Sequence, residues 1–351
     1  MKNFWQQLNK PLLALAPMAG VTDTPFRQMC KDYGADVIYT EFVSVDALCH
    51  GNAATRELIA FALAEQPVVC QLFGRTPELF FKAAKILEEM AFSGVDLNFG
   101  CPAYKVVKSG GGVKLMRNLA LVREIVQAAA EGSALPVSIK LRASIKRRAD
   151  TKDKVEDKAA EAELDKYECE LDSVTALDLV QKVKDLPVAA IMLHARSYEQ
   201  PFDGEPDVDM VKEVRKLWPG ILLANGGINS PEKAKEILDE TSADGVGIAR
   251  GSWGKPWIFQ QIKNYLESGR YETPTWKEIR HIMLRHAELA LSVKGEYGLI
   301  ELRKHLAWYA KGFSGASELR AQLVRVKSIS EVKSILAAAP VVQPHATPVV
   351  A

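Results

Sequence analysis

The segment Val95-Asp96-Leu97-Asn98-Phe99-Gly100-Cys101-Pro102 shows the unit from which the chain is built, a short apolar strand that ends in a reactive side chain. Gly100 permits an unusual backbone angle and Pro102 stops the strand, so Cys101 should lie just beyond the sheet edge. A Lys- and Gly-rich loop follows, and its length and charge predict a mobile lid over an anionic substrate. Cysteine is among the most buried residue types, so a core cysteine is the alternative interpretation.

Apolar segments of this kind recur and alternate with stretches whose apolar residues are spaced by three and four, which indicates helices. We predict strands at Leu12 to Ala16, Val37 to Tyr39, Val68 to Leu72, Val95 to Leu97, Val137 to Lys140, Ala190 to His194, Ile221 to Ala224 and Gly245 to Ile248. The predicted helices between them include Pro77 to Met90, Leu119 to Glu131, Val174 to Lys184 and Pro231 to Glu240. Eight such units in ~250 residues are typical of a TIM (β/α)8 barrel. A doubly wound open sheet is the alternative, but no GxGxxG follows the first strand.

Composition excludes several other classes of protein. Of 351 residues, 48% are hydrophobic and 25% charged, and no apolar run approaches the ~20 residues of a membrane helix. Residues 1–10 lack the apolar stretch of a signal peptide, so we expect no export. The five cysteines never form CxxC and the six histidines never form HxH or HxxxH. We therefore expect a cytoplasmic protein with neither a disulfide framework nor a metal site.

Two segments depart from the barrel pattern. Residues 146–172 contain 7 basic and 10 acidic residues among 27, which predicts a solvent-exposed charged insertion. Helical patterns then run from Trp276 to Val293, from Ile300 to Ala310 and from Ala316 to about Ile335. We predict a barrel domain over residues 1–254, an all-α domain over 255–336 and a disordered tail over 337–351. Residues 255–333 hold 14 Lys and Arg against 8 Asp and Glu, a weak signal for RNA or phosphate.

Polar and glycine residues follow nearly every predicted strand, and in a TIM barrel these carboxyl ends converge on the active-site face. Asn225-Gly226-Gly227 and Ala249-Arg250 follow strands seven and eight, the usual place for a phosphate in this fold. They fit flavin mononucleotide, pyridoxal phosphate or a sugar phosphate almost equally. Gln71, Lys140 and His194 favour a flavin, because its pyrimidine edge needs hydrogen bonds and a nearby positive charge. Taken singly, a polar residue at a strand end would more often serve only a turn.

Basic and aromatic residues alternate in one C-terminal helix, at Arg303-Lys304-His305 and Trp308-Tyr309. This pattern suits RNA, whose backbone is anionic and whose bases stack on aromatic rings. An amphipathic helix that packs Leu302, Leu306 and Tyr309 inward is the alternative.

Five separated motifs stand in one order along the chain: Pro17-Met18-Ala19-Gly20-Val21-Thr22-Asp23, Asn98-Phe99-Gly100-Cys101-Pro102, His194-Ala195-Arg196-Ser197, Asn225-Gly226-Gly227-Ile228, and Arg303-Lys304-His305-Leu306 with Trp308-Tyr309. Their order and spacing resemble the tRNA-dihydrouridine synthases, in particular the bacterial B type. The resemblance implies an FMN-binding TIM barrel, a tRNA-binding helical domain, NADPH or NADH as reductant and uridine in tRNA as substrate.

The resemblance also implies a role for each matching residue. Cys101 would be the general acid, because a thiol with a pKa near ~8.5 is mostly protonated at neutral pH and can donate a proton to the base. Asn98 and Arg196 would lie against the uracil, and Arg303 and Lys304 would contact tRNA. The flavin would be held by Pro17, Met18, Ala19, Gln71, Lys140, His194, Asn225, Gly226, Gly227, Ala249 and Arg250.

The motifs differ from the family's usual pattern at several positions. His194-Ala195-Arg196-Ser197 stands in place of His-Gly-Arg-Thr, and Asn225-Gly226-Gly227 in place of Asn-Gly-Asp. The backbone can still serve the flavin at both places. The insertion at 146–172 follows a strand on the active-site face and would influence which tRNA position is reached. A flavin-dependent reductase of free pyrimidines and a non-catalytic tRNA-binding protein are the alternatives, and we expect a monomer.

Overall fold

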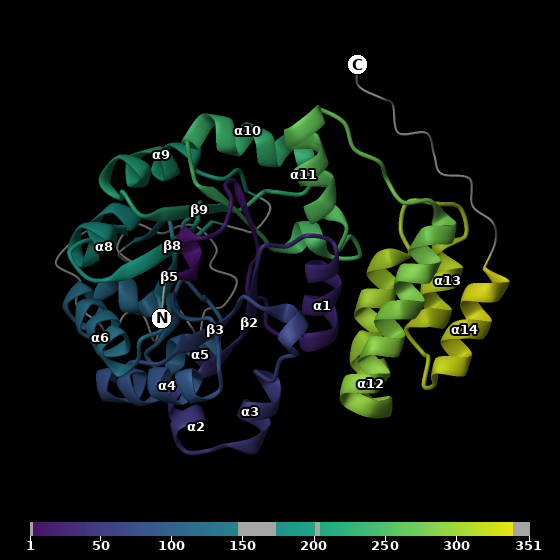
Figure 1. Ribbon diagram of the computed structural model, residues 1–351, viewed down its shortest axis with the longest axis horizontal. Coiled ribbons are helices and arrows are strands. Elements are labelled where there is room, and N and C mark those ends of the chain that lie inside the picture. The colour runs from purple at the N-terminus through teal and green to yellow at the C-terminus, as the bar shows by residue number, and fades with distance from the viewer. Residues whose placement is uncertain (1–2, 147–172, 201–203, 340–351) are drawn as a thin grey trace.

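The computed structural model describes residues 3–146, 173–200 and 204–339, which form a closed parallel barrel with a helical unit beside it (Figure 1). Around the barrel the strands follow the order β1-β10-β9-β8-β5-β4-β3-β2. In chain order they are β1 (Leu12–Leu15), β2 (Val37–Ser44), β3 (Val68–Phe73), β4 (Gly94–Phe99), β5 (Val137–Arg142), β8 (Val188–His194), β9 (Ile221–Asn225) and β10 (Gly245–Ile248). The eight predicted strands and the TIM-barrel fold are confirmed. The largest difference is β2, which continues five residues beyond its predicted end at Tyr39.

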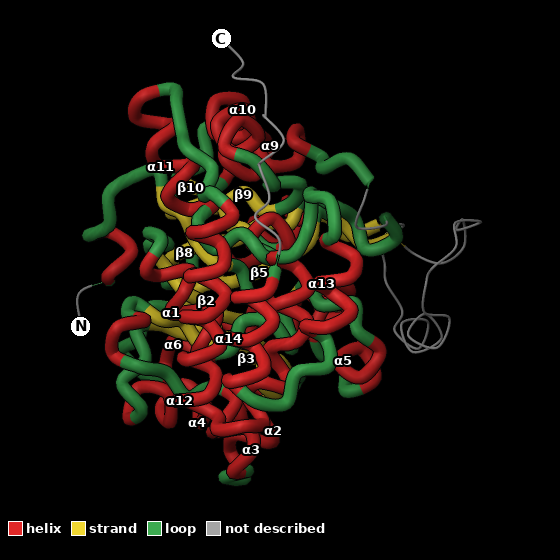
Figure 2. Tube along the Cα trace, turned by 90° about the vertical axis from the view of Figure 1, so that its right-hand side faces the viewer, coloured by secondary structure: helices red, strands yellow, loops and turns green. Residues whose placement is uncertain are grey.

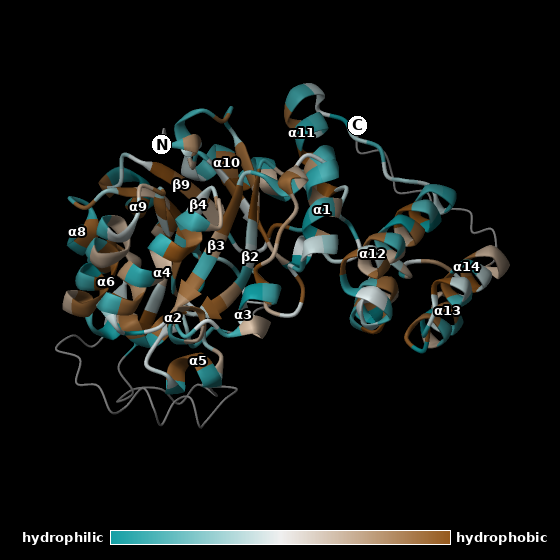
Figure 3. Ribbon diagram, turned by 60° about the horizontal axis from the view of Figure 1, so that its bottom comes forward, coloured by the Kyte–Doolittle hydropathy of each residue, from teal (hydrophilic) through white to brown (hydrophobic). Residues whose placement is uncertain are grey.

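Successive side chains along each strand point alternately into and out of the barrel, which divides the core into two layers. In β1, Leu12 and Ala14 belong to the cluster inside the barrel, whereas Leu13 and Leu15 pack outward under the helices. Both faces are therefore buried, which explains the continuous apolar runs of the strands, brown in Figure 3. Trp5, from a short 3₁₀ turn (Phe4–Gln6), is also buried in the inner cluster.

The barrel is surrounded by helices, most of which bury an apolar face, although the short helix at Ala53–Leu58 has no buried residue. They are α1 (Thr24–Asp32), α2 (Val45–Cys49), α3 (Ala53–Leu58), α4 (Pro77–Glu89), α6 (Leu119–Gly132), α8 (Ala176–Val183), α9 (Val208–Leu217), α10 (Pro231–Thr241) and α11 (Ile258–Ser268). The four predicted helices are present, although α8 begins two residues later than expected because Val174 lies in a strand. Among the described helices, none is long and apolar enough to cross a membrane.

Two short antiparallel strands, β6 (Ser144–Lys146) and β7 (Ser173–Thr175), flank the predicted charged insertion. Beyond Lys146, the insertion lies outside the described residues. Most of the predicted tail also lies outside them. Its first two residues, however, were wrongly predicted to be disordered, because α14 (Ile329–Ala338) includes them.

The helical unit consists of α12 (Trp276–Tyr309), α13 (Ala316–Leu323) and α14. α12 is two helices joined at Gly295, whose φ of 63° and ψ of −156° are not helical. The two halves fold back on each other, since Nδ1 of His286 lies 3.1 Å from the Tyr309 hydroxyl. This agrees with the two predicted helices. The third predicted helical run, from Ala316 to about Ile335, is instead divided between α13 and α14.

The helical unit packs beside α1 of the barrel (Figures 1 and 2). Met29 of α1 belongs to the hydrophobic cluster of the helical unit, and Arg285 of α12 pairs with Asp32 at 2.6 Å. In contrast, Phe259 and Ile262 of α11 belong to the core of the barrel. The domain limit at residue 254 stays a prediction, and the packing of α11 favours a limit after this helix.

Candidate active site

A cavity of about 790 Å³ opens at the carboxyl ends of the barrel strands, and its size is typical of small-molecule sites. Each strand, or the turn directly after it, contributes to its wall. Most of the predicted site residues line it, namely Pro17, Met18, Gln71, Asn98, Cys101, Lys140, His194, Arg196, Asn225, Gly226, Gly227, Ala249 and Arg250. Barrel closure therefore brings together side chains that are up to ~230 residues apart in the chain.

Three predicted residues, all in the described part of the chain, lie outside the cavity lining: Ala19, Arg303 and Lys304. Arg303 donates from Nε and Nη2 to the Val326 carbonyl oxygen at 2.9 and 2.7 Å, so it fastens α12 to the chain after α13. The Lys304 ammonium lies beside the turn after β1, 3.9 Å from where a Cβ on Gly20 would be. The flavin contact of Ala19 and the tRNA contacts of Arg303 and Lys304 stay predictions.

The cavity also includes residues that the sequence analysis did not select as site residues. Arg142 lies two positions after Lys140 on β5, and alternate residues of a strand share a face, so strand periodicity could have identified it. Phe42 was missed because β2 was predicted too short. Trp253 lies beyond the last strand, where no local pattern indicates its direction. The other additional lining residues are Ala16, Gly100, Pro102, Ile228, Asn229, Gly247 and Gly251.

Cationic side chains dominate the electrostatics of the cavity: Lys140, Arg142, Arg196 and Arg250 line it. Burial lowers the pKa of Lys140 to about 8, and the charge of Arg142 acts in the same direction. His194 lies among these four charges, and burial, followed by their repulsion, lowers its pKa to about 2. His194 is therefore neutral and Lys140 mostly protonated at neutral pH, so the cavity favours an anion. Among the described residues, no group of three or more His, Cys, Asp or Glu could hold a metal ion.

Cys101 is held at the cavity wall by its own backbone. Asn98 Oδ1 accepts hydrogen bonds from the N–H groups of Gly100 and Cys101, at 3.1 and 2.9 Å. Arg142 Nε donates to the Gly100 carbonyl oxygen at 3.0 Å, which fixes the same turn from β5. Burial raises the pKa of the Cys101 thiol, and this outweighs the opposing effect of Arg142 and Lys140. The thiol therefore remains protonated at neutral pH, the state that a proton donor requires.

The segment after Cys101 differs from the open mobile loop that the sequence predicted. It forms a short helix, α5 (Tyr104–Lys108), followed by a 3₁₀ helix (Gly112–Arg117). Apolar side chains of both, among them Val107 and Met116, are buried, and the Val113 N–H donates to the Cys101 carbonyl oxygen at 3.1 Å. The segment thus packs against the barrel through the buried apolar side chains of both helices.

The turn after β9 forms a narrow cradle in the cavity. Gly226 and Gly227 have φ values of 120° and 73°, which favour glycine. A Cβ on Gly226 would lie only 3.0 Å from the His194 ring. Asn225 fixes the turn, because its Nδ2 donates to the β10 backbone at 2.6 Å and its Oδ1 accepts from Lys140 Nζ at 3.3 Å. The missing side chains leave room for a ligand to approach the backbone.

The helical unit reaches the cavity wall through two stacked indole rings. Trp253, which lines the cavity, stacks on Trp308 of α12 with ring centroids 4.4 Å apart and planes inclined by 6°. Trp253 Nε1 donates to the sulfur of Met18, another lining residue, at 3.2 Å. Nearby, Lys294 of α12 pairs with Asp23 after the β1 turn, at 2.8 Å. The cavity is therefore joined physically to the helical unit.

Comparison with known proteins agrees with this geometry. The model of the dihydrouridine synthase family matches residues 14–164 and 167–343. The tRNA-dihydrouridine synthase B of Pseudomonas aeruginosa is 32% identical over 90% of this chain and 88% of its own length. That of Vibrio parahaemolyticus is 33% identical over 88% and 89%, and a probable tRNA-dihydrouridine synthase 1 of Synechocystis is 30% identical over 92% and 84%.

Among solved structures, histamine dehydrogenase from Rhizobium matches with a TM-score of 0.51 over 79% of this chain and 48% of its own. Its 13% identity supports the barrel fold alone. The family model, in contrast, spans both the barrel and the helical unit, and the curated relatives are matched over most of their length. The chain therefore belongs to the dihydrouridine synthase family.

Proposed function

We propose that this protein reduces the C5–C6 double bond of uridine in tRNA to give 5,6-dihydrouridine, with bound FMN and with NADPH or NADH as the electron source. One observation carries the proposal: the cavity combines a half-buried, protonated thiol at Cys101 with a ring of cationic side chains. Membership of the family and the names of the curated relatives indicate the substrate.

The residues around the cavity fit FMN. Gly226 and Gly227 have no side chains, so a ligand can approach the backbone of this turn beside the His194 ring. Arg250 lies on the neighbouring turn, where it can pair with a phosphate. Lys140 provides a positive charge and Gln71 an amide, which suit the pyrimidine edge of an isoalloxazine ring. When bound, FMN supplies a hydride to C6 of the uracil ring.

The chain supplies the proton that completes the reduction. As negative charge develops on the uracil, the Cys101 S–H bond breaks and its proton goes to C5, after which the thiolate recovers a proton from solvent. Cationic Lys140, Arg142 and Arg196, which line the cavity, offset the developing charge. Asn98 and Arg196 orient the uracil, since both line the cavity and Asn98 contacts the turn of Cys101.

A base within folded tRNA must leave its stack to enter such a cavity. The helical unit beside the cavity, joined to it by Trp308 and Lys294, presents the surface that holds the rest of the tRNA. Residues 255–333 carry six more basic than acidic residues, which agrees with an anionic partner. We propose that the protein acts as a monomer in the cytoplasm.

The test begins with the visible spectrum and the extracted cofactor of the purified protein. In vitro transcribed tRNA is then incubated with the protein and NADPH, and its nucleosides are analysed by mass spectrometry for a gain of two hydrogen atoms. Cys101→Ala should retain the flavin and slow reduction by about 100-fold or more. Cys49→Ala is the matched control, because Cys49 is half-buried and lies outside the cavity lining.

The other outcomes separate the alternatives. A flavoprotein that reduces free uracil but not tRNA would be a pyrimidine reductase. A colourless protein that binds tRNA would be a non-catalytic binding protein. Full activity of Cys101→Ala would remove the thiol from the mechanism.

A further inference from the structure

A chain of hydrogen bonds runs beneath the cavity and ends at Cys101. Ser138 Oγ donates to Asp96 Oδ1 at 2.7 Å, and Gln71 Nε2 donates to Asp96 Oδ2 at 2.7 Å. Asn98 Nδ2 then donates to Gln71 Oε1 at 3.0 Å. The chain continues to the turn of the proton donor, because Asn98 Oδ1 accepts the N–H groups of Gly100 and Cys101.

Both ends of this chain determine its direction. The N–H groups of Gly100 and Cys101 can only donate, so the carbonyl oxygen of the Asn98 amide must face them. The Asn98 amino group must then face Gln71, which turns the Gln71 amino group towards Asp96. A carboxylate can only accept, so Asp96 requires the same orientation. Each of the two side-chain amides, Gln71 and Asn98, could point either way, but only one combination of orientations gives every group in the network a hydrogen-bond partner.

Asp96 itself does not touch the cavity. Its side chain is fully buried, and it is not among the lining residues, whereas Gln71 and Asn98 both are. Burial of a carboxylate is costly unless hydrogen bonds compensate it. In Asp96 two donors offset part of this cost, and burial still raises its pKa to about 6, so Asp96 is mostly ionised at pH 7.

We propose that Asp96 is a positioning residue, which sets the amide orientations of Gln71 and Asn98 and thereby holds the backbone of Cys101 in place for proton donation. Its consequence for catalysis rests on the proposed function, but the positioning itself does not. Asp96 acts only through other residues.

Reversing the direction of the hydrogen bonds between residues 96, 71 and 98 tests the proposal without any assay of the reaction. In Asn98→Asp, a carboxylate at 98 faces Gln71 Oε1; if Gln71 turns, its oxygen faces Asp96 instead. Either arrangement sets oxygen against oxygen. Adding Asp96→Asn removes the conflict, because Asn at 96 can donate to a reversed Gln71, whose amino group then donates to the carboxylate at 98. The total charge beside Lys140 is also unchanged.

We therefore expect the double variant Asp96→Asn/Asn98→Asp to unfold at a higher urea concentration than Asn98→Asp alone. The second change would thus stabilise the protein, although Asp96→Asn in the wild-type background should not. A double variant that is less stable than Asn98→Asp would overturn the proposal, because independent sites simply add their costs.

The position of Cys101 is measured by its rate of alkylation with iodoacetamide, followed on the peptide that carries it. Cys49 in the same protein is the internal control. Asp96→Leu should change the Cys101 rate by about threefold or more and leave the Cys49 rate unchanged. Asp96→Asn can still accept from Gln71 with its carbonyl oxygen, so it should restore a rate close to that of the wild type.

On tRNA, Asp96→Leu should lower kcat by about tenfold or more, because the proton donor and the amides of Gln71 and Asn98 lose their fixed positions. Ser138→Ala removes the other hydrogen bond to the same carboxylate and should have a much smaller effect on kcat. If alkylation of Cys101 is unchanged in a folded Asp96→Leu protein, Asp96 has no positioning role. If alkylation changes but tRNA is not reduced even by the wild type, the proposed function fails and the positioning role stands.

Discussion

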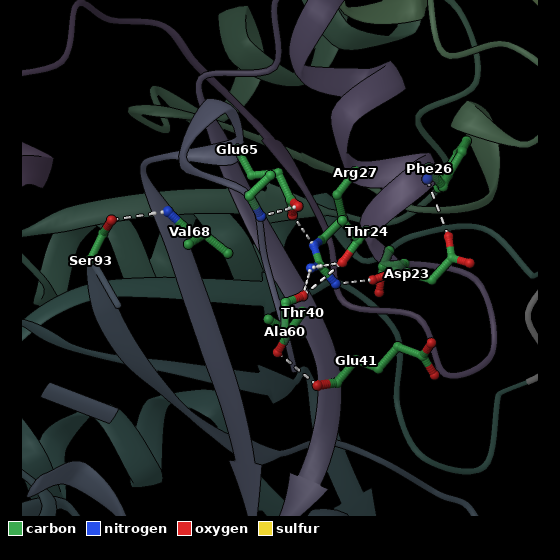
Figure 4. A network of polar contacts seen from close by, with 12 residues as sticks. Asp23, Thr24, Phe26, Arg27, Thr40, Glu41, Ala60, Glu65, Val68 and Ser93 are labelled. Atoms are coloured by element: carbon green, nitrogen blue, oxygen red, sulfur yellow. Dashed lines mark hydrogen bonds and ion pairs between the residues drawn. The ribbon is translucent and has the colours of Figure 1, made fainter. Parts of the chain in front are cut away.

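Replacement of Arg27 by methionine would show how firmly the turn beside the cavity wall is held. The side chains of Arg27 and Glu65 are fully buried and pair through Nε and Oε2 at 2.5 Å (Figure 4). The guanidinium also donates to the carbonyl oxygens of Thr22 and Ala60, at 2.7 and 2.6 Å. The pair therefore ties α1 to the turn after β1 and to the chain that leads into β3.

The expected loss follows from these contacts. Arg27→Met keeps the apolar volume of the side chain but leaves the Glu65 carboxylate buried without its charged partner. Among the described residues, that carboxylate then keeps one hydrogen bond, from the Ala62 N–H at 2.8 Å. Breaking a buried ion pair from one side costs about 3–5 kcal/mol. We expect the free energy of unfolding to fall by about 4 kcal/mol at pH 7.

The loss should depend on pH. Burial already raises the pKa of Glu65 while Arg27 is present, and removal of the opposing charge raises it further. In the variant the folded state thus holds a proton on Glu65 more tightly than the unfolded state does. Such a group stabilises the folded state at low pH and loses this effect as pH rises. The difference between variant and wild type should therefore shrink between pH 7 and pH 5.

The assay is urea unfolding followed by circular dichroism at both pH values. Arg285→Met is the control, because Arg285 and Asp32 form an exposed pair at 2.6 Å, and such pairs contribute about 1 kcal/mol or less. A loss below about 1 kcal/mol for Arg27→Met at pH 7 would refute the reasoning, as would a loss that is equal at both pH values.

Three further predictions concern the cavity. Gly226→Ala should lose flavin, since φ is 120° and a Cβ would lie 3.0 Å from a neighbouring ring; Gly51→Ala, with φ of 70° and open space, should keep it. Absorbance of the purified variants measures this. Trp253→Leu, Trp308→Leu and the double variant form a double-mutant cycle, measured by urea unfolding. We expect a coupling free energy of about 0.5–1.5 kcal/mol between the stacked rings, and additive losses of stability would contradict this. Flavin affinity, titrated by fluorescence quenching, should weaken as pH rises through about 8, where Lys140 loses its proton; a Lys140→Met protein with the same inflection would exclude Lys140 as its source.

Local sequence patterns were sufficient to predict the barrel and most of its cavity. Apolar runs of strand length alternate with helical spacing, and a parallel barrel places the carboxyl ends of all its strands on one face. Residues such as Gln71, Lys140 and His194 could therefore be grouped from their positions at strand ends alone. The two halves of α12 were also predicted, because the apolar periodicity is interrupted on either side of Gly295.

Contacts between distant segments were decided only by the tertiary structure. Arg27 and Glu65 are 38 residues apart, and Gln71 and Asp96 are 25 apart, with no local pattern that links either pair. Trp253 stands outside every strand, so only the packing of α12 shows that it forms part of the wall. Periodicity indicates which face of an element is buried, whereas the partner that a buried polar group meets depends on how elements from different parts of the chain pack together.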